Sequence, residues 1–193
     1  MIFATGNRHK LRELRELLPG VGLDPLPDDV QLPPEEGETF AEIALIKART
    51  VSAATGEATV ADDSGIEAAG LDGRPGIYSA RFAGEGASDE VNLEKLLREV
   101  AAAGEDRRAA YVCALAFIDE DGAEHVFEAR CEGYLTEQPR GEGGFGYDPA
   151  FVPEATGAAD ERTMSELSDA EKNKISHRGL AAEKLAAHLG LKR

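Results

Sequence analysis

The chain has 193 residues and a formal net charge of −16, with 37 Asp and Glu against 21 Lys and Arg, and 42% of its residues are apolar. This composition excludes a disordered or fibrous chain, and so acidic a surface disfavours DNA or RNA as a partner, because their backbones require a basic face. No apolar run approaches the roughly 20 residues that span a bilayer, and the N-terminus lacks the pattern of a signal peptide. We expect a single domain over 1–193, in the cytoplasm, with no membrane partner.

The first half of the chain alternates helical patterns with short apolar runs. Thr39, with Glu42 three residues later, is the pattern of a helix cap, and Gly56 is a typical helix end. The expected elements are, in order, a helix over Arg8–Leu18, a candidate strand over Val21–Pro27, a loop over Asp28–Glu38, a helix over Thr39–Ala54 and a strand over Ala58–Ala61. The last strand leads into Asp62-Asp63-Ser64-Gly65, a composition that favours a turn.

The second half contains the pattern of one hairpin. Its first strand is apolar on both faces, which places it centrally in a sheet. The expected elements are a helix over Ser88–Ala102, hairpin strands over Ala109–Ile118 and Glu124–Leu135, an irregular segment over Gly141–Pro153, and a helix that a capping box opens at Ser168 and that breaks near Ser176–Gly179. Parallel βα units together with an antiparallel hairpin indicate an α/β fold with a mixed central sheet flanked by helices.

The two cysteines, Cys113 and Cys131, lie on the two hairpin strands. The two residues could face each other across the hairpin and form a disulfide. Both are more typical of small core residues in a protein from a reducing compartment. We expect free thiols.

The segment Thr5-Gly6-Asn7-Arg8-His9-Lys10 follows a strand and opens a helix. Backbone N–H groups and the positive end of the helix dipole favour an anion there, and Lys10 can reach back over the first turn. The sequence is not a Walker A loop, which requires G-x-x-x-x-G-K-[ST]. An ordinary strand–turn–helix connection is the competing interpretation.

Lys47 occupies the stripe of its helix where an apolar residue belongs. Lysine is almost never fully buried without a partner, so Lys47 either extends to the surface along its apolar stem or lines a cleft. The carboxylates of Asp62 and Asp63, with the acidic loop Glu35–Glu38, supply the oxygen ligands that Mg²⁺ prefers. A solvated charge run is the alternative for that loop.

Two further groups carry candidate chemistry. The run Gly143–Pro149 places aromatic rings among glycines, which suits a platform for a flat heterocycle or a plain buried loop. Lys172, His177 and Arg178 gather near a helix break, where Arg or His donors can read a keto oxygen on a base edge.

Six motifs occur in order: T-G-N-R-H-K at 5–10, T-F-A-E-I-A-L-I-K-A at 39–48, A-D-D-S-G-I at 61–66, G-R-P-G-I-Y-S-A-R at 73–81, G-G-F-G-Y-D-P-A-F at 143–151 and S-H-R-G at 176–179. In these motifs the chain resembles the inosine triphosphate pyrophosphatase family, the dITP/XTP pyrophosphatases. The resemblance covers almost the whole chain. It implies two lobes around a nucleotide cleft, Mg²⁺ as cofactor, a homodimer, and hydrolysis of ITP, dITP or XTP to the monophosphate and pyrophosphate.

The resemblance also implies roles for individual residues. Thr5–Lys10 and Lys47 bind the triphosphate, and Ser64 lies beside it. Asp63 is the general base and a metal residue, with Asp62 shaping the turn and supporting it. Glu35 is the second acidic group at the metal, with Glu36 and Glu42 as rivals. The base-binding residues are Phe145, Gly146, Tyr147, Asp148, Lys172, His177 and Arg178.

One position departs from the family pattern, because Ile43 stands where T-F-x-E-N-A commonly has Asn. If that Asn supports an acidic group, its loss should lower activity or change the surroundings of that group. The remaining motif residues are intact, so we still expect an active enzyme. A nucleotide-binding sensor without catalysis is the competing function, although the acidic pair and both lysines disfavour it. An interaction module with an acidic face explains the charge but none of the motifs.

Overall fold

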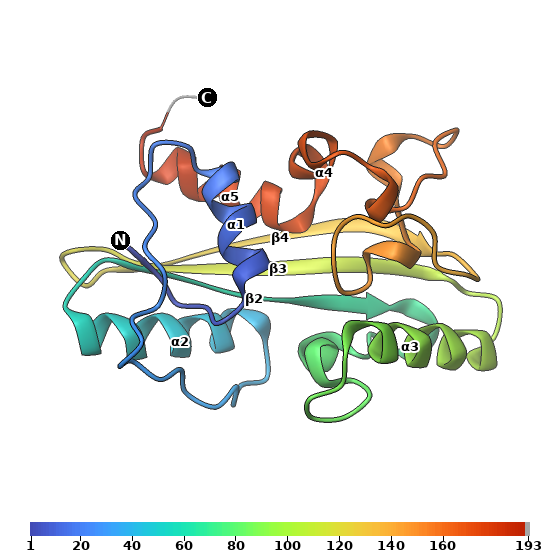
Figure 1. The fold of residues 1–193 in the computed structure, drawn as a ribbon, viewed down its shortest axis with the longest axis horizontal. Coiled ribbons are helices and arrows are strands. Elements are labelled where there is room, and N and C mark those ends of the chain that lie inside the picture. The colour runs from blue at the N-terminus through green and yellow to red at the C-terminus, as the bar shows by residue number, and fades with distance from the viewer. Residues whose placement is uncertain (192–193) are drawn as a thin grey trace. The chain divides into compact units, whose positions relative to one another are not determined.

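The computed structural model describes residues 1–191, which form two compact units (Figure 1). Unit 1 comprises Met1–Asp63, Cys113–Ala129 and the described residues from Arg178 onward, and unit 2 comprises Ser64–Val112 and Arg130–His177. Each unit has its own cluster of buried apolar side chains. The expectation of one domain over the whole chain stays a prediction.

A five-stranded sheet runs in the order β1-β2-β3-β4-β5. The strands are β1 (Ile2–Phe3), β2 (Thr59–Ala68), β3 (Arg108–Ile118), β4 (Glu124–Leu135) and β5 (Phe151–Pro153). β1 pairs with β2 in parallel and β4 with β5 antiparallel, which confirms the predicted mixed sheet. β3 is the middle strand and is buried at every position after Arg108, as its two apolar faces predicted.

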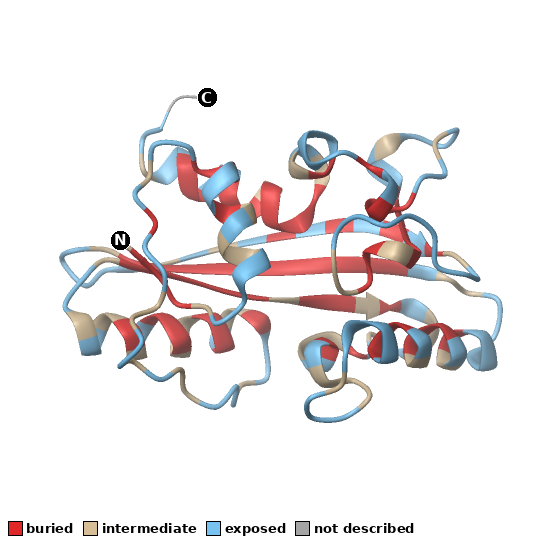
Figure 2. Cartoon of the chain, viewed as in Figure 1, coloured by how far each residue is buried: buried red, intermediate tan, exposed pale blue. Residues whose placement is uncertain are grey.

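In unit 1, helix α2 (Phe40–Thr55) covers one face of the strands, and α1 (Arg8–Leu17) with α5 (His177–His188) covers the other (Figure 1). Asn7 caps α1 and Thr39 caps α2, whose C-terminus ends at Gly56 in the left-handed conformation (φ 72°). The inward faces of these helices are buried (Figure 2). The unit's core includes Phe3, Leu14, Leu18, Val60, Leu115 and Leu185.

In unit 2, the main helices are α3 (Asp89–Ala103), capped by Ser88, and the short α4 (Asp169–Ile175). The predicted capping box is present, because Ser168 accepts from the Glu171 N–H while the Glu171 side chain accepts from the Ser168 N–H. The predicted helix break falls at Ser176, before α5. The unit's core includes Ile66, Leu96, Tyr111, Leu135, Phe151 and Met164.

Two strand predictions are wrong. Over Val21–Pro27 only Asp24 makes a bridge, to Ile2, because Pro25 and Pro27 have no N–H to donate to a ladder. β2 does not end at the aspartates but continues through Asp62 and Asp63 to Ala68. The turn chemistry of Asp-Asp-Ser-Gly is overridden because both carboxylates have cationic partners inside the fold.

Both cysteines are buried and free, Cys113 in the unit 1 core and Cys131 in that of unit 2, as expected for core thiols. Burial raises the pKa of each thiol to about 12. Within residues 1–191, no helix has the length and apolar character needed to cross a membrane.

Candidate functional site

Asp62 and Asp63 are neighbours in β2 of unit 1 and have different partners. Successive side chains of a strand point to opposite faces. Asp62 Oδ2 lies 3.0 Å from Lys10 Nζ of α1 and 3.0 Å from Arg178 Nη2 of α5. Asp63 Oδ1 lies 2.8 Å from Lys47 Nζ of α2. The strand therefore delivers one carboxylate to each helical layer of the unit.

Asp62 belongs to a buried ion-pair network. Arg178 is 2% exposed, and its Nη1 also donates to Glu13 Oε2 at 2.5 Å. Burial alone raises the pKa of Asp62, but the charges of Lys10 and Arg178 outweigh it and hold the pKa well below its ordinary value. Asp62 is thus an ionised anchor for α1 and α5. The prediction that Asp62 shapes a turn is wrong.

The negative charge of Asp63 is offset less fully by its partners than that of Asp62. Burial raises the pKa of Asp63 above its ordinary value, because the Lys47 charge offsets only part of the desolvation and Glu35 adds a like charge. Lys47 is only 6% exposed, so it does not extend to the surface. Burial lowers the pKa of Lys47, but Asp63, Asp62 and Glu35 outweigh this and raise it, so the ammonium stays charged. A carboxylate with a raised pKa is suited to accept a proton.

The acidic loop contributes Glu35 to this group, with Oε1 at 3.2 Å from Lys47 Nζ. Of its rivals, Glu42 accepts a hydrogen bond from the Glu38 N–H. Glu36 is exposed, as Glu35 is, but Glu35 is paired with Lys47. Ile43, the departure from the family pattern, is buried in α2 and packs beneath Gly37 of the same loop. Proximity to Lys47 therefore favours Glu35 among the three acids, while its metal role stays a prediction.

Mg²⁺ typically takes one or two carboxylates from the protein and its other ligands from substrate phosphates and water. Among residues 1–191, no group of three or more His, Cys, Asp or Glu side chains converges closely enough to hold a metal alone. Asp63 and Glu35 do converge on one ammonium group. This two-carboxylate set fits Mg²⁺ bound together with a phosphorylated ligand and does not fit a closed structural site.

The loop Thr5–Lys10 begins α1 with an exposed turn. Asn7 Oδ1 accepts hydrogen bonds from the backbone N–H groups of His9 and Lys10 at 2.9 and 3.3 Å, and Thr5 Oγ1 accepts from the Asn7 N–H. Asn7 is thus first a helix cap. Binding of an anion by this loop remains a prediction, supported by its exposure and by Lys10.

A second group of predicted residues lies in unit 2, around Asp148. Asp148 Oδ2 accepts hydrogen bonds from Lys172 Nζ at 2.8 Å and from the Phe145 N–H at 2.9 Å. Lys172 Nζ also lies 5.1 Å from the centre of the Phe145 ring. Gly144, at φ 73°, passes so close to the Asp148 carboxylate that a Cβ would clash with it. The glycine-rich loop thereby wraps around one buried carboxylate.

The two predicted aromatic residues have different environments. Tyr147 is 5% exposed and donates to the Ser79 carbonyl at 2.6 Å, so it is a core residue, whereas Phe145 is half-buried. The N–H of Gly146 donates to Asp89 of α3. Phe145 is therefore the ring with surface left for a ligand to stack on.

Of the remaining predictions, His177 belongs to the unit 2 group and Arg178 to the Asp62 network of unit 1. Ser64 follows Asp63 in β2.

Sequence reasoning missed Tyr111 of β3, whose hydroxyl donates to Asp148 Oδ1 at 3.1 Å. The available signal was a tyrosine in a strand apolar on both faces, since a buried hydroxyl needs a partner.

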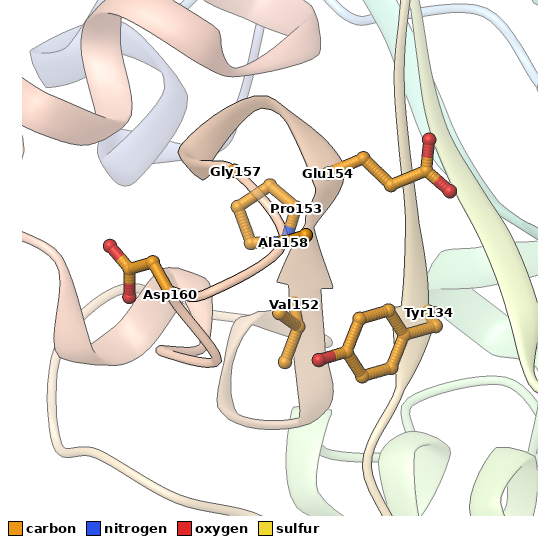
Figure 3. A pocket seen from close by; sticks show the side chains of 7 residues that line it. All are labelled: Tyr134, Val152, Pro153, Glu154, Gly157, Ala158 and Asp160. Atoms are coloured by element: carbon orange, nitrogen blue, oxygen red, sulfur yellow. The ribbon is translucent and has the colours of Figure 1, made fainter.

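A pocket of about 440 Å³ opens elsewhere in unit 2. It is lined by Tyr134, Val152, Pro153, Glu154, Gly157, Ala158 and Asp160 (Figure 3). None of these is a predicted site residue, and Asp160 is engaged by Arg162 at 2.8 Å. The size of a pocket alone does not identify a site, and the chemistry lies in the two groups above.

The fold and the two residue groups define an α/β protein whose lysines and carboxylates suit a phosphorylated ligand. The Ham1 family model matches residues 1–188, and the chain belongs to the Ham1 family. The chain is 47% identical to a dITP/XTP pyrophosphatase of Bacillus licheniformis, with 98% of this chain and 97% of that protein covered, and 46% identical to one of Thermus thermophilus, with 96% and 89% covered.

Solved structures agree with this assignment. A HAM1 protein of Coxiella burnetii matches with a TM-score of 0.87 at 39% identity, and the Ham1 protein of Staphylococcus aureus with 0.86 at 37%. In both cases 98% of this chain and 97% of the solved chain are covered. The resemblance drawn from the six motifs is thereby confirmed, together with the α/β fold.

Proposed function

We propose that this chain hydrolyses nonstandard purine nucleoside triphosphates, ITP, dITP and XTP, to the monophosphate and pyrophosphate, and so cleanses the nucleotide pool. It is a nucleoside triphosphate pyrophosphatase, a hydrolase of phosphoric anhydride bonds. The single observation that carries the proposal is the grouping of Asp63, Lys47 and Glu35 in unit 1. Such a group supplies a base, a fixed cation and a second carboxylate.

In this proposal the unit 1 residues act on the triphosphate. Lys10 and Lys47 offset phosphate charge, and the exposed turn Thr5–His9 donates backbone hydrogen bonds. Asp63, ionised, takes a proton from the attacking water as the water oxygen bonds to the α-phosphorus. The bond from that phosphorus to the α–β bridging oxygen breaks, and pyrophosphate leaves with the electron pair.

Mg²⁺ is part of the proposal as cofactor, held by Asp63 and Glu35. When bound, it would neutralise phosphate charge and polarise the phosphoryl oxygens. Without such a cation, two carboxylates beside a triphosphate would repel it, because Lys47 alone carries one positive charge against their two.

In unit 2, the proposed task is selection of the base. Phe145 offers a ring face for stacking, and Lys172 and His177 offer donors to the 6-keto oxygen of hypoxanthine or xanthine. Adenine carries an amino group at that position and presents a donor rather than an acceptor. Donors held at that edge therefore disfavour ATP.

The test is pyrophosphate release from ITP, XTP and ATP, each measured with Mg²⁺ and with excess chelator. We expect rapid release from ITP and XTP, slow release from ATP, and none with chelator. Release from none of the three would overturn the proposal and favour a nucleotide sensor. Equal release from all three would leave a pyrophosphatase without the proposed base selection.

We further propose a cytoplasmic homodimer, on the family resemblance, with Gly76–Phe82 contributing to the subunit contact. Tyr78 of this segment is 56% exposed, which suits a residue that a partner covers. Light scattering should give the mass of two chains, and Tyr78→Glu should reduce it to one. Val126→Glu, at an exposed apolar residue of unit 1, is the matched control and should leave the dimer intact. A single-chain mass for the wild type at every concentration would refute the dimer.

A further inference from the structure

We infer that Tyr111 is a positioning residue for base selection, holding His177 with its ring and Asp148 with its hydroxyl. The inference rests on the proposed function, since it assumes that these two residues and Lys172 face the purine. Tyr111 lies on β3, the middle strand of the sheet, and is 6% exposed. It does not need to touch the nucleotide, because it acts through residues that do.

The ring of Tyr111 fixes the plane of the imidazole. The two ring centroids lie 4.5 Å apart and the planes differ by 4°, so the rings are stacked in parallel. His177 is itself 5% exposed and begins α5. A ring stacked on one side retains little freedom to tilt, and its nitrogen positions are therefore set relative to β3.

The hydroxyl of Tyr111 fixes the carboxylate. It donates to Asp148 Oδ1 at 3.1 Å, while Oδ2 of the same carboxylate accepts from Lys172 Nζ at 2.8 Å and from the Phe145 N–H. Burial and the Asp148 charge raise the pKa of Tyr111 well above its ordinary value, so the hydroxyl keeps its proton and remains a donor. With both oxygens engaged, the carboxylate cannot rotate, and the ammonium of Lys172 stays where Oδ2 holds it.

Tyr111 is thus one side chain with two separable functions. The ring of Tyr111 also meets Phe151 edge-on, with centroids 4.8 Å apart and planes at 67°. Phe151 is fully buried, so this contact belongs to the core and not to the base-selecting groups. If position 111 needed only to be buried, leucine or phenylalanine would serve there. A tyrosine here gives both a face for His177 and a donor for Asp148.

The test compares Tyr111→Phe, which keeps the stack and removes the hydroxyl, with Tyr111→Leu, which removes both. Phe151→Leu is the matched control, because it disturbs the same core without removing either Tyr111 contact. For each protein we would measure kcat and KM for ITP and for ATP, calorimetric binding of the product IMP and of AMP, and the unfolding midpoint.

We expect Tyr111→Phe to lower the ITP-to-ATP ratio of kcat/KM about tenfold, the size of one hydrogen bond to a charged group. Tyr111→Leu should lower it by about tenfold more, the upper range for an aromatic pair. The loss should appear mainly in KM for ITP and in IMP binding, with kcat for ATP nearly unchanged. Phe151→Leu should lower the unfolding midpoint and leave the ratio within about twofold of wild type, since it removes no contact to the base-selecting groups.

If wild type discriminates between ITP and ATP and both Tyr111 variants keep its ratio, Tyr111 is only a core residue and this inference fails while the proposed function stands. If Phe151→Leu lowers the ratio as much as Tyr111→Leu, general loosening of the core explains the effect and the inference again fails. If wild type neither binds IMP nor hydrolyses ITP, the proposed function fails and takes the inference with it.

Discussion

Asp62 and Asp63 stand next to each other in β2, and the fold shifts their pKa values in opposite directions. Asp62 has two cationic partners, Lys10 and Arg178, and its pKa lies well below the ordinary value. Asp63 has Lys47, but burial and the nearby Glu35 raise its pKa. Paired groups whose environments push their pKa values apart are the mark of divided roles. One aspartate is arranged to remain ionised, and the other to take up a proton.

This division predicts that conservative changes at the two positions have different effects. Asp63→Asn should lower kcat for ITP by about 10²-fold to 10⁴-fold, the usual contribution of a general base. Its stability should change little, because the Lys47 ammonium still has Glu35 as an ion-pair partner. Asp62→Asn should instead lower the free energy of unfolding by about 3–5 kcal/mol, since it leaves the buried Arg178 and the partly buried Lys10 with less opposing charge. Steady-state kinetics and urea unfolding of both variants measure this.

Comparable activity in Asp63→Asn and wild type would remove Asp63 from the role of base. Unchanged stability in Asp62→Asn would show that Glu13 alone satisfies Arg178, and the anchoring role of Asp62 would fail.

The pH dependence of stability should carry the signature of Asp62. Its pKa in the fold is below the 3.8 of an unperturbed aspartate, so the ionised carboxylate contributes stability that is complete above pH 3.8 and is lost as pH falls below it. In that range the free energy of unfolding should fall by about 1.4 kcal/mol per pH unit from this group, and Asp62→Asn should lack that part of the slope. Asp28→Asn, at an exposed aspartate of the loop before α2, is the control and should keep the slope. An Asp62→Asn slope equal to that of wild type would contradict the prediction.

Local elements of this fold could be predicted from the sequence, because their causes are local. The caps at Thr39 and Ser168 are side chains that bond the backbone three residues ahead, and each stands where the sequence predicted it. The middle position of β3 followed from a strand apolar on both faces. The six motifs, being contiguous, also indicated the family.

The site itself depends on contacts that are distant in the chain. Lys47 and Asp63 are 16 residues apart, Tyr111 and Asp148 are 37 apart, and Arg178 and Asp62 are 116 apart. The continuation of β2 through its aspartates was mispredicted for this reason, since the Asp-Asp-Ser-Gly composition favours a turn until Lys10 and Arg178 supply the opposing charge. Tyr111 was overlooked because only the fold reveals the partner of its hydroxyl.

Lys47 should set the pH at which the enzyme begins to work. As the base, Asp63 must be ionised, so kcat/KM should fall as pH drops through its raised pKa. The Lys47 charge opposes that rise, and Lys47→Met should move the acid limb to higher pH. It should also lower kcat/KM about tenfold to a hundredfold, the range for losing a charged hydrogen bond. Lys184→Met, at an exposed lysine of α5, is the control. An acid limb that does not move would mean that another group titrates in it.

Glu35 should govern the requirement for Mg²⁺. We expect Glu35→Gln to raise the Mg²⁺ concentration for half-maximal activity about tenfold or more, as loss of a carboxylate at or near a metal does, with less effect on kcat at saturating Mg²⁺. Mg²⁺-dependent stabilisation against heat in the presence of IMP should weaken in parallel. Glu36→Gln is the matched control on the same loop and should behave as wild type. If Glu36→Gln raises the requirement and Glu35→Gln does not, the assignment of the two glutamates must be reversed.

Ile43 is where this chain departs from the family pattern, and its surroundings predict what restoring asparagine would do. The side chain is 1% exposed, and a Cβ on Gly37 would come within 2.8 Å of its Cγ1, so Ile43 packs directly beneath the acidic loop that carries Glu35. An amide buried there without a full set of partners costs about 1–3 kcal/mol, and Ile43→Asn should lower the free energy of unfolding by that amount. If the family asparagine supports an acidic group, kcat for ITP should rise in the same variant.

Ile43→Val is the control, because it removes one methylene, costs about 0.5–1.5 kcal/mol and adds no amide. Higher activity in both variants would point to loosening of the loop rather than to the amide, and lower activity in Ile43→Asn alone would show that apolar packing under Glu35 is what this chain requires.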